Sequence, residues 1–285
     1  MKILFCTDGS EISMNSLHNA ASFIKEAVID SICVIDWSFL PTSMNIDSES
    51  YSKAYENIAE SVLNFSENLI KEKGLTAGKK IKSFGSAVEG ILEQINEDDY
   101  DLILMGSHGK KGIQKWLGSV SRQIISNTTV PVFISRKKTD NKKILFTVDG
   151  SEHSFNSVKT ACKILNLEDK EITIISVKEN PELLPIEATM DRNWLESIEK
   201  QQKIHASKAI NKAKTILEKC ELKIHNEVIL TGNPAQKIIE YADKEKIDLV
   251  ILGARTKTDL SKLLLGSVSK RVIENTNSDI LIISK

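Results

Sequence analysis

Two turns in this sequence have the composition of a phosphate-binding site. One is Asp8-Gly9-Ser10, and the other is Gly106-Ser107-His108-Gly109, which is followed by Gly118-Ser119. Glycine lets a ligand approach the main chain closely. The N-terminus of a helix offers unpaired N–H groups and a partial positive charge, which suit phosphate. These residues therefore indicate an anion site, provided that the fold brings the two turns together.

Both turns return in the second half of the chain in the same order. KILFCTDGSE at 2–11 returns as KILFTVDGSE at 143–152, and DLILMG at 101–106 returns as DLVILG at 248–253. LGSVS at 117–121 also returns, at 265–269. A repeat this long indicates a tandem duplication of a whole domain. We expect domains at 1–137 and 143–285, joined by the charged segment 136–142.

Short apolar runs alternate with segments of helical period in both halves, which is typical of βα units around a parallel sheet. The sequence predicts an α/β fold: two tandem five-stranded parallel-sheet domains of Rossmann-like type, with strand order 3-2-1-4-5. The expected strands are 2–7, 31–35, 80–84, 102–105 and 130–135, then 144–148, 172–177, 224–230, 249–252 and 279–283.

This topology predicts where a ligand would bind. Open parallel sheets bind ligands beyond the carboxyl ends of their strands, where the strand order reverses. The Asp-Gly-Ser turn follows the first strand of each half, and the glycine loop follows the fourth. If strands one and four flank the reversal, the two turns face each other across one crevice.

The first-strand Asp, with a fourth-strand loop of the form Gly-x2-Gly-x9-Gly-Ser/Thr, resembles the universal stress proteins over nearly the whole chain. The resemblance implies an ATP site. The Asp would lie near adenine and ribose, the end of the second strand would lie against adenine, and the glycine loop would surround the phosphates. The first site would comprise Asp8, Trp37, Met105, Gly106, His108, Gly109, Gly118, Ser119 and Val120. The second would comprise Asp149, Val177, Leu252, Gly253, Gly266, Ser267 and Val268.

Each half departs from the family pattern. In the first, eight residues separate Gly109 from Gly118 instead of nine. In the second the spacing is kept, but Thr256 replaces a glycine, and its side chain could block a phosphate or donate to it. Trp37 stands where the family favours an aliphatic residue.

Several of these residues also have simpler structural explanations. Asp8 and Asp149 could simply cap the helices that follow them. His108 could contact phosphate or be a solvated loop residue. The histidines show no metal-ligand spacing, and the four cysteines lack a CxxC motif and are expected to be incidental or packing thiols.

Composition excludes several classes of protein. The chain has 285 residues, 41% hydrophobic and 27% charged, with a net charge of −1, which is ordinary for globular domains and does not favour nucleic acid. No apolar stretch is long enough to span a membrane, and an early Asp8 argues against a signal peptide. We expect a cytoplasmic protein.

The leading hypothesis is an ATP-binding stress or regulatory protein, with or without Mg²⁺, in which the nucleotide acts as a conformational switch. No loop residue is an evident general base, so fast hydrolysis is not expected. The alternatives are a weak ATPase that uses His108, and an interaction module whose nucleotide sites have decayed. We also expect an internal pseudo-dimer in which 130–135 pairs with 279–283, with further homodimerisation open.

Overall fold

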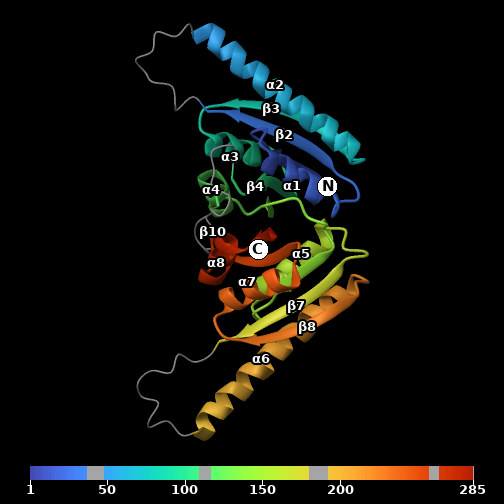
Figure 1. The fold of residues 1–285 in the computed structure, drawn as a ribbon, viewed down its shortest axis with the longest axis vertical. Coiled ribbons are helices and arrows are strands. Elements are labelled where there is room, and N and C mark those ends of the chain that lie inside the picture. The colour runs from blue at the N-terminus through green and yellow to red at the C-terminus, as the bar shows by residue number, and fades with distance from the viewer. Residues whose placement is uncertain (37–47, 109–116, 180–191, 257–262, 285) are drawn as a thin grey trace. The chain divides into compact units, whose positions relative to one another are not determined.

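Strands and helices alternate throughout the computed structural model (Figure 1). It describes residues 1–36, 48–108, 117–179, 192–256 and 263–284. The chain divides into two compact units, the first mainly of Met1–Thr139 and the second mainly of Asp140–Lys163, Leu167–Thr256 and Leu264–Lys285. The boundaries expected at 137 and 143 stay predictions.

The first unit is a five-stranded parallel sheet. Its strands are hydrogen-bonded in the order β3-β2-β1-β4-β5, which is the predicted order. Along the chain its elements are β1 (Lys2–Cys6), α1 (Glu11–Ala21), β2 (Val28–Ile35), α2 (Ser48–Glu72), β3 (Thr76–Phe84), α3 (Ala87–Glu97), β4 (Leu102–Gly106), α4 (Ser119–Asn127) and β5 (Val132–Ser135).

The second unit repeats this arrangement. Its strands run parallel in the order β8-β7-β6-β9-β11, and a short strand that the sequence did not predict, β10, pairs with β9. The elements are β6 (Lys143–Thr147), α5 (Glu152–Ile164), β7 (Glu171–Lys178), α6 (Arg192–Lys219), β8 (Ile224–Thr231), α7 (Pro234–Glu245), β9 (Leu249–Thr256), β10 (Leu263–Leu264), α8 (Ser267–Asn275) and β11 (Asp279–Ser284).

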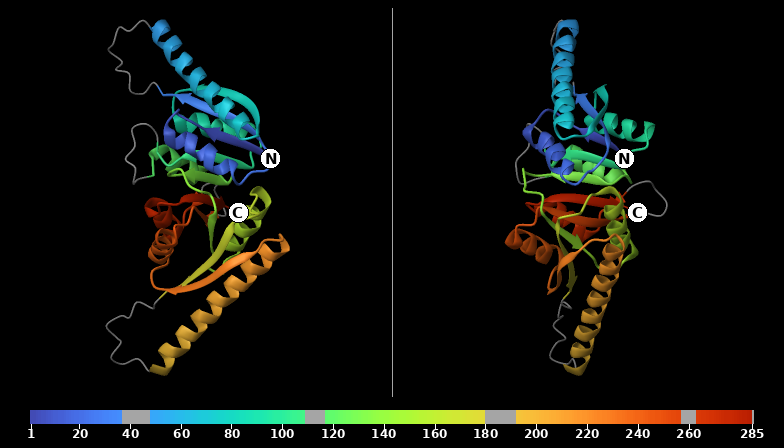
Figure 2. Two further views of the ribbon diagram at one scale, coloured as in Figure 1. Left: turned by 45° about the vertical axis from the view of Figure 1, so that its right-hand side comes forward. Right: turned by 90° about the vertical axis from the view of Figure 1, so that its right-hand side faces the viewer.

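Helices pack against each sheet and bury its central strands (Figure 2). All five residues of β4 and the three central residues of β6 are buried, as expected for parallel strands that are covered on both faces. The apolar runs seen in the sequence therefore form the two cores. Among the described residues, no helix has the length and hydropathy needed to cross a membrane.

Strands β2 and β3 start earlier than the sequence predicts, and in β2 the start was missed because a buried acid interrupts the apolar pattern. Asp30 on β2 is 1% exposed. Its carboxylate accepts hydrogen bonds from the backbone N–H of Lys79 (2.7 Å) and the hydroxyl of Tyr100 (3.0 Å). Gly78 is required beside it, since a Cβ there would overlap the Asp30 carboxylate. A hydrogen-bonded buried acid is compatible with a strand that periodicity alone does not reveal.

The fourth strand of each unit contains a glycine at the point where a helix lies directly against the strand. A Cβ at Gly253 would lie 3.0 Å from the carbonyl oxygen of His153 and 3.2 Å from the Cα of Ser154, in the first turn of α5. A Cβ at Gly106 would lie 3.0 Å from the backbone nitrogen of Ser13 in α1. These glycines let the helix and the strand end pack together.

We predict that Gly253→Ala destabilises the protein by about 1–3 kcal/mol, because the new methyl group meets backbone atoms that cannot rotate away. Thermal and urea unfolding followed by circular dichroism measure this. The matched control is Gly266→Ala, where φ is −58° and no atom of the residues that the structure describes lies within 4 Å of the new Cβ. Equal stability of the two variants would contradict the packing argument.

Candidate functional site

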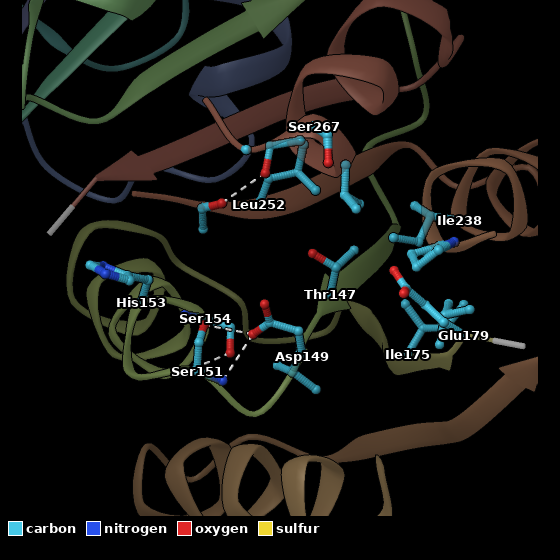
Figure 3. Close-up of a pocket in the computed structure, with 17 residues that line it drawn as sticks. Thr147, Asp149, Ser151, His153, Ser154, Ile175, Glu179, Ile238, Leu252 and Ser267 are labelled. Carbon is cyan, nitrogen blue, oxygen red and sulfur yellow. Dashed lines mark hydrogen bonds between the residues drawn. The ribbon is translucent and has the colours of Figure 1, made fainter. Parts of the chain in front are cut away.

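The carboxyl ends of β6 and β9 open into one cavity of about 430 Å³ in the second unit (Figure 3). The two strands are hydrogen-bonded neighbours, so the turns that follow them share one edge of the sheet. All seven residues selected from the sequence of this half line the cavity: Asp149, Val177, Leu252, Gly253, Gly266, Ser267 and Val268. The duplicated turns therefore converge in this unit.

The N-terminus of α8 forms one wall, and its first-turn N–H groups lack a side-chain cap. Gly266 is the N-cap residue. By contrast, Ser10, Ser86 and Asn233 cap α1, α3 and α7 through side-chain oxygens. Among the described residues, no atom lies within 4 Å of a Cβ built on Gly266, so their packing does not require glycine there. The wall thus presents helix N–H groups and a bare main chain to the cavity, the arrangement that binds anions.

A serine fixes this wall to the end of β9. The Ser269 hydroxyl, in the first turn of α8, donates to the carbonyl oxygen of Gly253 (3.0 Å). In the first unit the Ser121 hydroxyl donates to the carbonyl oxygen of Gly106 (2.8 Å). The final serine of the Gly-Ser-Val-Ser repeat therefore holds the start of the helix in place in both units.

Asp149 lies on the opposite side, on the turn between β6 and α5 (Figure 3). Its Oδ1 accepts hydrogen bonds from the backbone N–H of Ser151 (2.9 Å) and from the Ser151 hydroxyl (2.6 Å). The Ser151 hydroxyl oxygen in turn accepts from the N–H of Ser154 (3.2 Å). The helix cap is thus Ser151. The same holds in the first unit, where Ser10 caps α1 and Asp8 accepts from the Ser10 N–H (3.0 Å).

These hydrogen bonds keep Asp149 ionised. Burial alone would raise the pKa of its carboxyl, but the hydrogen bonds from Ser151 and Ser154 outweigh burial and hold the pKa below its usual range. The cavity therefore has opposite electrostatic character at its two sides, with a carboxylate facing the positive end of a helix dipole. A ligand that fits both would carry an anionic group at one end and hydrogen-bond donors toward the other.

Apolar residues that the sequence did not single out form further walls of this cavity. Ile175 lies on β7, while Pro234 and Ile238 lie on the first turns of α7; all three line it, together with Thr147 and Glu179. Helix α7 begins at Pro234, directly after the N-cap residue Asn233. Because all the parallel strands of the unit end at the same edge of the sheet, the helix that follows β8 starts near the site, and the strand register determines which of its residues face the cavity.

The first unit has a smaller cavity at the equivalent edge, about 130 Å³. Of the residues selected there, five line it: Asp8, Met105, Gly106, His108 and Val120. Trp37 and Gly109 lie outside the described residues. Gly118 and Ser119 do not line the cavity. The N–H of Gly118 donates to the carbonyl oxygen of Ser107 (2.6 Å), so this amide of the loop is already paired within the protein.

His108 is not a solvated loop residue. It is 9% exposed, and its Nδ1 forms a hydrogen bond with the Ser107 hydroxyl (3.0 Å).

The strand register shows which residues of β2 and β7 occupy equivalent positions in the two units. Cys6 pairs with Ile32, and its repeat partner Thr147 pairs with Ile175. Two residues further on, Val34 therefore corresponds to Val177, and Val34 lines the first cavity, although the sequence analysis selected Trp37.

Comparison with known proteins agrees with this geometry. The model of the Universal stress protein family matches residues 1–136 and 140–284. Universal stress protein Slr1230 of Synechocystis sp. is 23% identical over an alignment of 304 residues that covers 98% of each chain. Universal stress protein MJ0531 of Methanocaldococcus jannaschii is 37% identical over 144 residues, 50% of this chain and 82% of that protein.

A solved structure has the same fold over the full length. The crystal structure of a universal stress protein from Archaeoglobus fulgidus matches 99% of this chain and 98% of its own, with a TM-score of 0.65 and 19% sequence identity. The α/β, Rossmann-like architecture predicted from the sequence is thereby confirmed.

We predict that Ser151→Ala raises the pKa of Asp149 toward its usual range, because the variant loses a hydroxyl that donates to the carboxylate. Carbon-detected NMR titration of the Asp carboxyl groups measures this. The variant also loses the α5 cap, which costs about 1 kcal/mol of stability. The matched control, Ser10→Ala, removes the α1 cap and should leave the pKa of Asp149 unchanged. An unchanged Asp149 pKa in Ser151→Ala would contradict the assignment.

The stability of this variant should also depend on pH. Because the folded-state pKa of Asp149 is lowered, its ionised form stabilises the fold above the pKa of the unfolded chain. This stabilisation is lost as the pH falls through the lowered folded-state value. The difference in unfolding free energy between wild type and Ser151→Ala should therefore narrow below about pH 4.

Proposed function

Because the chain belongs to the universal stress protein family, we propose that it is a cytoplasmic stress-response regulator that binds an adenine nucleotide in the cavity of its second unit. One observation carries the proposal: the uncapped N-terminus of α8, bare at Gly266, faces the ionised Asp149 across the cavity. The nucleotide acts as a switch, because it stabilises whichever conformation binds it better.

The polarity of the cavity orients the ligand. The phosphates would meet the N–H groups at Gly266 and Ser267, since these groups are the positive end of α8. Asp149 repels phosphate and accepts hydrogen bonds, so it suits ribose hydroxyl groups. The base would then lie between Ile175 and Ile238, whose apolar side chains suit a flat ring. Mg²⁺, when present, would be bound largely by the phosphates, as is usual for this ion.

Cavity size favours the site of the second unit over the equivalent site of the first. Ligand sites commonly measure about 300–1,000 Å³. The second cavity, at about 430 Å³, falls in this range, and the first, at about 130 Å³, does not. The first site also uses the Gly118 amide internally. We therefore expect one nucleotide per chain.

Isothermal titration of the full chain with ATP and Mg²⁺ tests this. We expect a stoichiometry near one. Gly266→Ala should weaken binding by about tenfold, because its methyl group intrudes on the phosphates; an intrusion of this size costs about 1–3 kcal/mol. Asp149→Asn should weaken binding by a similar factor, because hydrogen bonds to a charged acceptor are worth about 1.5–3 kcal/mol.

The matched control is Asp8→Asn, the same change in the first unit, which should leave the affinity unaltered. Loss of binding in Asp8→Asn but not in Asp149→Asn would move the site to the first unit. No binding at millimolar ATP, and no thermal shift, would overturn the proposal and favour an interaction module without nucleotide.

We also propose that the two units pair through residues 130–135 and 279–283, as an internal pseudo-dimer. Strand β5 bonds to β4 along one edge, and β11 bonds to β9 along one edge. Pairing the other edges with each other would remove two strand edges that favour aggregation. Hydrogen exchange tests this: amides of β5 and β11 that face away from β4 and β9 should exchange slowly, and rapid exchange of these amides would contradict the pairing.

A further inference from the structure

Glu179 places a second carboxylate in the cavity of the second unit. It directly follows the carboxyl end of β7. Ile175, Val177 and Glu179 all line the cavity. They are every second residue along the extended chain, so their side chains lie on the same face of the sheet. Exposure increases along this row: Ile175 is buried, Val177 is half-buried and Glu179 is exposed. Glu179 therefore lies at the rim of the apolar wall formed by β7 and α7.

This carboxylate is available to a ligand. In Figure 3 it lies beside Ile175 and Ile238, away from Ser267 at the start of α8. Within the part of the chain that the structure describes, Glu179 makes no hydrogen bond or ion pair. Asp149, by contrast, already accepts two hydrogen bonds from Ser151. Of the two carboxylates that line the cavity, Glu179 thus has the larger unused capacity to accept hydrogen bonds.

The chemistry of this position selects the edge of a base. An ionised carboxylate accepts hydrogen bonds and donates none, so it favours a group rich in N–H donors and disfavours phosphate. Aminopurines present such donors on the edge that pairs with other bases. A ring held between Ile175 and Ile238 would direct that edge to the open rim, where Glu179 lies.

We propose that Glu179 is a specificity-determining residue that accepts hydrogen bonds from the amino edge of an aminopurine bound in the second unit. This inference rests on the proposed nucleotide site and adds to it the group that selects the base. The corresponding position in the first unit is Asp36, by the register that aligns Val34 with Val177. An acid therefore follows the second strand in both copies.

The test compares ATP with purine riboside 5′-triphosphate, which lacks only the amino group. Both are titrated into the full chain as wild type, Glu179→Gln and Glu179→Ala. Wild type should bind ATP about tenfold more tightly than the analogue. This factor corresponds to the lower part of the free-energy range for a hydrogen bond to a charged acceptor, because Glu179 is exposed. This ratio should fall to a few-fold in Glu179→Gln and to about one in Glu179→Ala.

The matched control is Glu171→Gln at the other end of β7, which should keep the wild-type ratio. A ratio that is the same in wild type and Glu179→Ala would overturn the inference while leaving the nucleotide site intact. Failure of wild type to bind either triphosphate would instead overturn the proposed function. Tighter binding of GTP than ATP, lost in Glu179→Ala, would support the same chemistry with guanine as the base.

Discussion

Close packing at one glycine determines how the site is built. Gly253 lies in β9 against the first turn of α5 at His153 and Ser154, and its carbonyl oxygen accepts a hydrogen bond from the Ser269 hydroxyl of α8. One residue without a side chain therefore joins a strand and the starts of two helices. The turn that holds Asp149 and the N-terminus of α8 face each other because both are fixed to this point. Gly106 does the same in the first unit.

Helix capping follows the same plan in both copies. Helices α1, α3, α5 and α7 each begin with a serine or asparagine whose side chain accepts a first-turn N–H. Helices α4 and α8 begin with glycine and have no such bond. Glycine at the N-cap makes a helix less stable than serine or asparagine does by only about a few tenths of a kcal/mol. The caps are absent at α4 and α8, whose first turns line the two cavities, so a ligand can replace the missing caps there.

Sequence patterns predicted the strands and the topology better than the boundaries and roles of individual residues. The apolar runs located the strands, and the repeat supplied the equivalence of the two halves, so all seven residues selected in the second half line one cavity. Periodicity missed the start of β2 because Asp30 is satisfied by partners distant in sequence.

Residues whose role depends on register could not be found in the same way. Val34 was passed over for Trp37, since only the pairing of β1 with β2 aligns Val34 with Val177. Ile238 and Glu179 were missed because an apolar helix position and an acid after a strand are common in any sequence. The structure distinguishes them by placing both in the same cavity.

The two copies share one fold but differ in the side chains around the site. In the first, the Thr7 hydroxyl accepts the N–H of Gly9 (3.1 Å) and pairs with the Ser13 hydroxyl (2.9 Å), which ties the Asp8 turn to α1. Val148 stands at the Thr7 position in the second copy and cannot make these bonds. The first copy thus satisfies more of its turn and loop amides internally, while the second leaves them facing a larger cavity. Since a ligand stabilises only the state that binds it, the proposed nucleotide would stabilise the second unit, while the first keeps its fold without one.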